Sequence, residues 1–107
     1  MTKSEAKKWS IKKWEWIVAH DGCKDGLVIA IPELLEFESG CAYCEKYSKS
    51  AKMKYYKNGY RTYCYTCPLF DRKELRDCSD VGSVFHVWYC YRNKETAQAV
   101  LDAIRRS

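Results

Sequence analysis

The chain has 107 residues, of which 47% are hydrophobic, and 19 Lys and Arg against 14 Asp and Glu give a formal net charge of +5. This length and hydrophobic content predict one folded domain over residues 1–107 and exclude a chain that is disordered throughout. No apolar run approaches the roughly 18–20 residues of a membrane span, so we expect no membrane-spanning segment. Residues 1–8 lack the apolar core of a secretory signal, so we expect a cytoplasmic protein in a reducing compartment.

Residues 4–20 predict a helix with Ser4 as its N-cap. Apolar side chains spread over more than half of its circumference, and charged side chains fill the remaining arc. We expect this helix to pack against the domain core, although its tryptophans also suit a face for a partner. The apolar positions are Ala6, Trp9, Trp14, Trp16, Ile17 and Val18.

Two short segments follow the turns at Gly22 and Gly26. Residues 27–31 form an apolar, β-branched run that favours a buried strand ending at Pro32. Residues 33–38 fit one or two helical turns with Pro32 at the first position, and a strand is the alternative, because periodicity does not decide over six residues.

The clearest local pattern lies at residues 53–64, where strand-forming Tyr and Thr residues flank Asn58-Gly59. An Asn-Gly pair suits a type I′ turn, so this segment predicts a β-hairpin. Pro68 suits the first turn of a helix over about residues 68–77.

The C-terminal part predicts one strand and one helix. Residues 84–91 are aromatic and β-branched throughout, which favours a strand. Asn93 suits the N-cap of a helix over residues 94–106, in which Ala97, Val100, Leu101 and Ile104 form an apolar stripe.

Two C-x2-C pairs are the strongest motif in the sequence: Cys41 and Cys44, and Cys64 and Cys67, separated by residues 45–63. Two such pairs supply four thiolates for a tetrahedral Zn²⁺ site with Zn–S distances of about 2.3 Å. A knuckle at 41–44, a hairpin at 53–63 and a helix from Pro68 come in the order of a treble-clef finger. The sequence therefore predicts an α+β fold, with a treble-clef-like zinc core over about residues 40–78 and helices at both ends.

Cys78 leaves the ligand set open, since five thiols compete for four positions. It is a substitute for Cys44 or Cys64, or a buried bystander. Buried thiols without metal are one further alternative. A four-cysteine iron–sulfur cluster is another, because Cys67-Pro68 resembles ferredoxin-like runs. Cys23 and Cys90 have no partner at ligand spacing, so we expect both to be small buried hydrophobes. We expect His20 and His86 to pack or lie at the surface rather than bind metal.

These residues resemble a group of small bacteriophage proteins with a Trp-containing N-terminal helix, a C-A-L-C-E type knuckle, a C-x2-C-P segment and one later cysteine. The resemblance implies a phage origin and a zinc site, and it implies no activity. Two departures are the Ser-Asp-Val-Gly sequence after Cys78 and a more basic hairpin. The matching pieces are Trp9, Trp14-Glu15, Cys41-Ala-Tyr-Cys44-Glu45, Cys64-Tyr-Thr-Cys67-Pro68 and Cys78.

The segment 43–65 is rich in tyrosine and lysine and has Glu45 as its single acid. Positive charge favours phosphates, and aromatic rings stack on bases, so a nucleic-acid surface is one interpretation. A surface for a protein partner and a solvated basic rim around the metal are the other two. The candidate binding residues are Lys54, Tyr55, Tyr56, Lys57, Tyr60 and Arg61.

We expect no enzyme, because a site closed by four cysteines has no open position for water. A metal-finger nuclease is the enzymatic alternative. The leading hypothesis is a phage-type zinc protein in the host cytoplasm that binds a host protein and inhibits or otherwise modulates it. A nucleic-acid-binding zinc finger is the second hypothesis, and the oligomeric state stays open.

Overall fold

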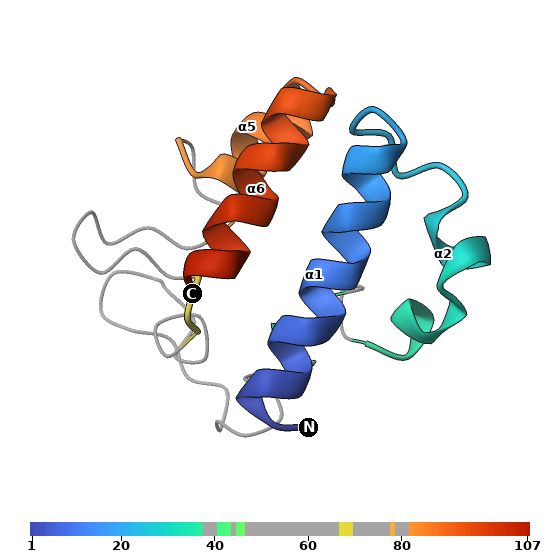
Figure 1. Cartoon of the computed structure of the whole chain (residues 1–107), viewed down its shortest axis with the longest axis vertical. Coiled ribbons are helices and arrows are strands. Elements are labelled where there is room, and N and C mark those ends of the chain that lie inside the picture. The colour runs from blue at the N-terminus through green and yellow to red at the C-terminus, as the bar shows by residue number, and fades with distance from the viewer. Residues whose placement is uncertain (38–40, 44, 47–66, 70–77, 79–81) are drawn as a thin grey trace.

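The molecule is built around two long helices, α1 (Lys3–Ala19) and α6 (Lys94–Arg106), that lie side by side (Figure 1). Three shorter elements complete the described part: α2 (Leu27–Ala30) and the 3-10 helix η1 (Pro32–Glu36) lie on the side of α1 away from α6, and α5 (Val84–Cys90) packs against α6. The computed structural model describes residues 1–37, 41–43, 45–46, 67–69, 78 and 82–107.

Helix α1 confirms the predicted N-terminal helix but begins at a different cap. Thr2, not Ser4, is the N-cap: its Oγ1 accepts the Glu5 N–H at 3.1 Å, and the Glu5 carboxylate accepts the Thr2 N–H at 3.2 Å. This reciprocal pair is a capping box, which requires an acceptor side chain three residues after the cap, and Lys7, three residues after Ser4, has no acceptor. Ala6, Trp14 and Ile17 are buried.

Helix α6 confirms the predicted C-terminal helix and its stripe. The Asn93 side chain accepts the Thr96 N–H at 2.9 Å, as expected of an N-cap. The buried face of α6 consists of Ala97, Val100, Leu101 and Ile104.

The strand predicted for residues 27–31 is wrong, because this run forms the single turn of α2. The N–H groups of Ile29 and Ala30 donate to the Gly26 carbonyl at 3.1 and 3.0 Å, so the backbone is satisfied locally. Gly26 starts this turn with a φ of 85°, a conformation that glycine adopts without a steric cost. After it, η1 confirms the helical interpretation of residues 33–38 as far as Glu36, with Pro32 as its first residue, while residue 38 lies outside the described residues.

The strand predicted for residues 84–91 is also wrong, because Val84–Cys90 is helix α5. Ser83 is its N-cap, and its Oγ accepts the His86 N–H at 3.1 Å. Val84 and Phe85 are partly buried and Trp88 is buried, a spacing that places all three on one helical face.

The predicted α+β, treble-clef-like fold is therefore not the observed one. Every regular element in the part of the chain that the structure describes is helical. The predicted hairpin at 53–63 and residues 70–77 of the predicted helix lie outside the described residues.

Trp14 of α1 joins α1 to α5 in the core. Its ring meets Trp88 edge-on, with centroids 4.8 Å apart, and meets Phe85 at 6.0 Å. The Trp88 Nε1–H donates to the Gly22 carbonyl at 2.9 Å, so α5 also holds the turn that follows α1. No helix among the described residues has the length and apolar character that crossing a membrane demands.

Candidate functional site

Cys41, the first cysteine of the first C-x2-C pair, lies in a segment that is tied to both long helices. Cys41 precedes a helical turn in which the Glu45 N–H donates to the Cys41 carbonyl at 3.0 Å. Tyr43, which stands between the two cysteines, is fully buried, and its hydroxyl lies 2.8 Å from the Ser107 hydroxyl. Because the Lys7 ammonium donates to the Ser107 carbonyl at 3.0 Å, this segment is tied to both α1 and the end of α6.

The other described candidate ligands are Cys67 and Cys78. Both thiol side chains are half-buried, as is Cys41, and Cys41 and Cys67 pack against the hydrophobic core. Cys78 is joined to α5, since its carbonyl accepts the Ser83 hydroxyl at 2.8 Å. Sheltered thiols of this kind fit a structural zinc ion.

The described residues do not complete a metal site on their own. Among them, no three His, Cys, Asp or Glu side chains gather closely enough to hold an ion. Cys44 and Cys64 lie outside the described residues. The four-cysteine zinc site, with Cys78 as a substitute ligand, therefore stays a prediction.

Cys23 and Cys90 do not occupy the buried positions that we expected. Both are exposed, and the Cys90 Sγ lies 3.9 Å from the ring nitrogens of His86, one turn earlier in α5. His20 is used locally: its ring stacks on Trp16 with centroids 3.7 Å apart, and its Nδ1 lies 2.7 Å from the Trp16 carbonyl oxygen.

An aromatic cavity of about 400 Å³ lies where α1 and α5 meet. Sequence reasoning missed it, because the strand expected for residues 84–91 would have sent alternate side chains to opposite faces. The Arg92 guanidinium lies 5.0 Å from the ring centroids of both Trp88 and Tyr89, a cation–π arrangement. The residues that line the cavity are Trp14, Cys78, Phe85, His86, Trp88 and Tyr89.

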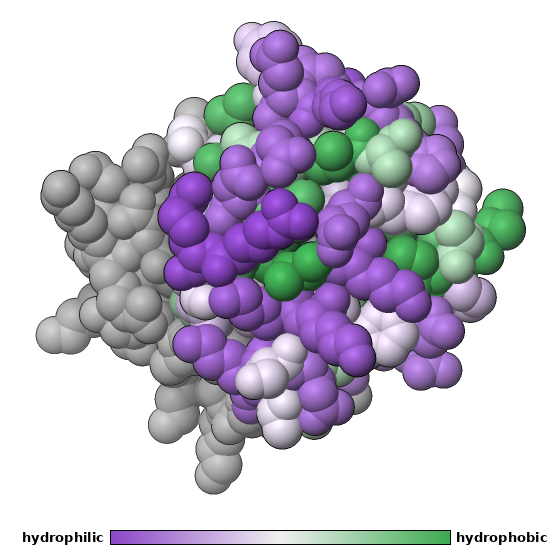
Figure 2. Space-filling view, in the orientation of Figure 1, coloured by the Kyte–Doolittle hydropathy of each residue, from purple (hydrophilic) through white to green (hydrophobic). Residues whose placement is uncertain are grey.

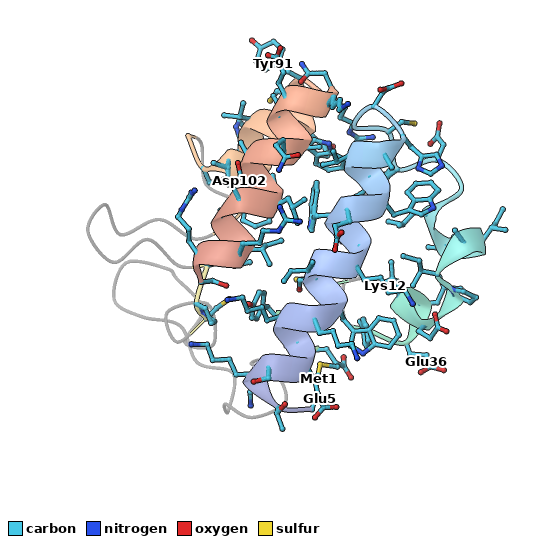
Figure 3. The ribbon with its side chains drawn as sticks, viewed as in Figure 1. Met1, Glu5, Lys12, Glu36, Tyr91 and Asp102 are labelled. Atoms are coloured by element: carbon cyan, nitrogen blue, oxygen red, sulfur yellow. The ribbon has the colours of Figure 1, made fainter. Side chains whose placement is uncertain are left out.

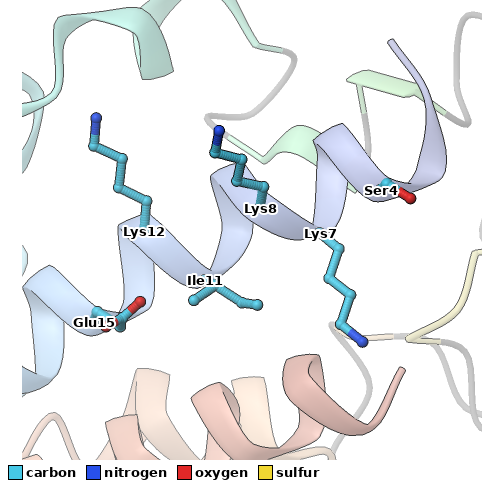
Figure 4. A pocket seen from close by; sticks show the side chains of 6 residues that line it. All are labelled: Ser4, Lys7, Lys8, Ile11, Lys12 and Glu15. Atoms are coloured by element: carbon cyan, nitrogen blue, oxygen red, sulfur yellow. The ribbon is translucent and has the colours of Figure 1, made fainter.

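A second hollow of about 600 Å³ runs along α1 and carries three lysines. Figure 4 shows Lys8 and Lys12 reaching out on one side of the helix, while Lys7 points toward the end of α6. Beside it, the Glu15 carboxylate and the Arg105 guanidinium form an exposed ion pair at 4.0 Å. The lining residues are Ser4, Lys7, Lys8, Ile11, Lys12 and Glu15.

Large apolar side chains are exposed on α2 and η1. Ile29 is 83% exposed, Leu35 is 71% exposed and Val28 is 44% exposed; we call these three residues the aliphatic ridge. Figure 2 shows hydrophobic atoms protruding at the edge of the molecule where α2 lies. The buried strand expected for residues 27–31 gave no reason to expect Val28 and Ile29 at the surface.

The binding residues predicted from the sequence cannot be compared with this geometry. Lys54, Tyr55, Tyr56, Lys57, Tyr60 and Arg61 all lie outside the described residues. Comparison of the sequence with protein-family models, curated proteins and solved structures gave no match. The resemblance to small phage proteins thus stays a prediction.

Proposed function

We propose that this protein is a zinc-stabilised, mainly helical binding protein that modulates another protein by occupying part of its surface. The observation that carries this proposal is the aliphatic ridge, in which Ile29 and Leu35 expose most of their side chains to water. Clustered exposed apolar side chains are typical of sites where another protein binds. Moving one Ile or Leu side chain out of water contributes about 1.5–3 kcal/mol.

The proposed zinc ion has a structural role. Cys41, Cys44, Cys64 and Cys67 would hold it, with Cys78 as the substitute ligand. Four thiolates close the coordination sphere, so the ion stabilises the fold and activates no water. The Tyr43 contact with Ser107 would transmit this stabilisation to α1 and α6.

The resemblance stated above makes the proposed partner a protein of a bacterial host and the proposed compartment the host cytoplasm. An inhibitor of this kind needs no catalytic group of its own, because covering part of the partner's surface is enough to block the partner's activity. We therefore expect binding of this protein to change the activity of its partner.

Capture from a bacterial lysate tests the proposal. We expect the wild-type chain to retain a stoichiometric protein partner, and the double variant Ile29→Glu/Leu35→Glu to lose it. Tyr91→Glu is the matched control, because Tyr91 is also 69% exposed but follows α5 instead of lying on the ridge. Finding no stoichiometric partner, or equal capture by all three chains, would contradict the proposal.

Nucleic-acid binding is the second candidate, and the lysines along α1 favour it. Lys7, Lys8 and Lys12 line one hollow, which gives the positive potential that a phosphate backbone requires. If this candidate holds, single-stranded DNA should bind with an affinity that falls steeply with salt. Lys8→Glu/Lys12→Glu should weaken binding and reduce that salt dependence, and a flat salt response in the wild type would contradict it.

A further inference from the structure

We infer that the aliphatic ridge receives a basic amphipathic helix of the partner. This inference rests on the proposed function and specifies the chemistry of the partner. It follows from three features of α2 and η1: the exposed apolar side chains, the charges beside them, and the hydrogen bonds that the local backbone N–H groups already make.

The segment that carries the ridge has apolar side chains on two faces. Leu27, Ile31 and Leu34 are buried in the core and anchor α2 and η1 to the molecule. Ile29 and Leu35 point away from that core and remain mostly exposed. The inner face is satisfied by the fold, so the outer face is available to a partner without unfolding anything.

The charge beside the ridge is negative, opposite to the net charge of the chain. Residues 25–37 contain Asp25, Glu33 and Glu36 and no Lys or Arg, whereas the whole chain carries +5. Both glutamates are exposed, and Figure 3 shows Glu36 on the side of α1 away from α6.

A lysine of α1 borders this region without pairing with its glutamates. Lys12, which Figure 3 places between α1 and η1, holds its ammonium 5.1 Å from the ring centroid of Trp9. Among the described residues it forms no ion pair with Glu33 or Glu36. A partner bearing lysine or arginine beside its apolar residues would therefore complement the ridge.

The backbone of the ridge excludes recognition by strand addition. The N–H groups of Ile29, Ala30 and Ile31 already donate to the carbonyls of Gly26 and Leu27 at 2.8–3.1 Å. A partner must therefore be recognised through side chains, and a helix presents apolar anchors at i, i+3 and i+4 on one face.

Two designed helices of opposite charge test the inference. Each is about 18 residues long, or five turns, with leucine on one face and either lysine or glutamate on the other. Because the whole chain is positive, nonspecific attraction favours the Leu/Glu helix. We expect the Leu/Lys helix to bind more tightly when both are titrated against the full chain by fluorescence anisotropy.

Charge reversal locates the site. Glu33→Lys/Glu36→Lys should weaken binding of the Leu/Lys helix about tenfold, and Ile29→Ser/Leu35→Ser should weaken binding of both helices. Glu95→Lys, at an acid in the first turn of α6, changes the net charge by as much as either single reversal, Glu33→Lys or Glu36→Lys, and as their control should leave the affinity unchanged. Tighter binding of the Leu/Glu helix, or insensitivity to the Glu33 and Glu36 changes, would overturn the inference.

The failures of the two proposals are distinguishable. If lysate capture depends on Ile29 and Leu35 but the Leu/Lys helix binds no more tightly than the Leu/Glu helix, the ridge binds a protein and the inferred basic character of that partner is wrong. If the chain instead self-associates in sedimentation and Glu33→Lys/Glu36→Lys abolishes it, a second copy occupies the ridge, which also overturns the inference.

Discussion

The hydroxyl of Tyr43 lies 2.8 Å from the hydroxyl of Ser107, which brings the segment that carries Cys41 against the C-terminal end of α6. Ser107 also receives the Lys7 ammonium at its carbonyl, so three separate parts of the chain meet at this residue. The position of Cys41 thus depends on a contact that the cysteine spacing does not specify.

Replacing Tyr43 tests how strongly this contact holds the segment. Tyr43→Phe keeps the buried ring and removes the hydroxyl, which should lower the free energy of unfolding by about 0.5–1.5 kcal/mol in urea denaturation. Tyr43→Ala also leaves a cavity and should cost about 3–5 kcal/mol. If the two variants are equally stable, the ring contributes nothing and this account of the anchor is wrong.

Metal content tests the zinc site directly. Elemental analysis of native protein should give one zinc per chain, and Cys41→Ser should lose it. Cys90→Ser is the matched control, since Cys90 is exposed on α5 and stands outside both pairs. A strong chelator should lower the melting temperature of the wild type. Protein that carries no metal and keeps its melting temperature with chelator would contradict the site.

The two long helices were predictable because their signals are local. For α6, the Asn93 cap and the stripe from Ala97 to Ile104 lie within the helix itself. The apolar composition of α1 likewise predicted burial, and only its cap differs, because Glu5 pairs with Thr2 rather than following Ser4 as the cap.

The two short helices were not predictable from composition, because β-branched and aromatic runs favour strands only when a neighbouring strand pairs with them. Ser83 as a cap of α5 was a signal that the sequence offered. The exposure of Ile29 had no such signal, since it depends on how the turn at Gly26 orients α2. Cysteine spacing indicates zinc chemistry but does not reveal that Tyr43, two residues after Cys41, contacts Ser107 at the end of α6.

The capping box at the start of α1 predicts a pH dependence of stability. Hydrogen bonds from the backbone and side chain of Thr2 lower the pKa of Glu5 below its ordinary value. A lowered carboxyl pKa stabilises the folded state above the unfolded-state pKa of about 4.3, and that stabilisation is lost as the pH falls through the folded-state pKa. Glu5→Gln should remove this part of the pH dependence.

Urea denaturation of wild type and Glu5→Gln between about pH 3 and pH 7 measures the effect, since this interval spans the carboxyl titration. Thr2→Ala keeps the backbone N–H that is the main cause of the lowered Glu5 pKa, so it should flatten the profile only in part, and it should lose about 1 kcal/mol from the missing cap. Parallel profiles for wild type and Glu5→Gln would show that the capping box does not couple α1 to pH.

Two glycines with the same positive φ allow backbone strain to be separated from steric contact. Gly22 and Gly26 both have a φ of 85°, so an alanine at either position is strained by about 1–2 kcal/mol. A Cβ at Gly22 would overlap the Asn93 backbone carbonyl, whereas at Gly26 the nearest atom, on Trp16, is 3.8 Å away. Gly22→Ala must therefore also push the turn after α1 away from the cap of α6.

We expect Gly22→Ala to be clearly less stable than Gly26→Ala in thermal denaturation. Loss of the hydrogen bond from Trp88 to the Gly22 carbonyl should be visible in tryptophan fluorescence. Equal melting temperatures for the two variants would mean that the close approach of Gly22 to Asn93 does not hold α1 and α6 together.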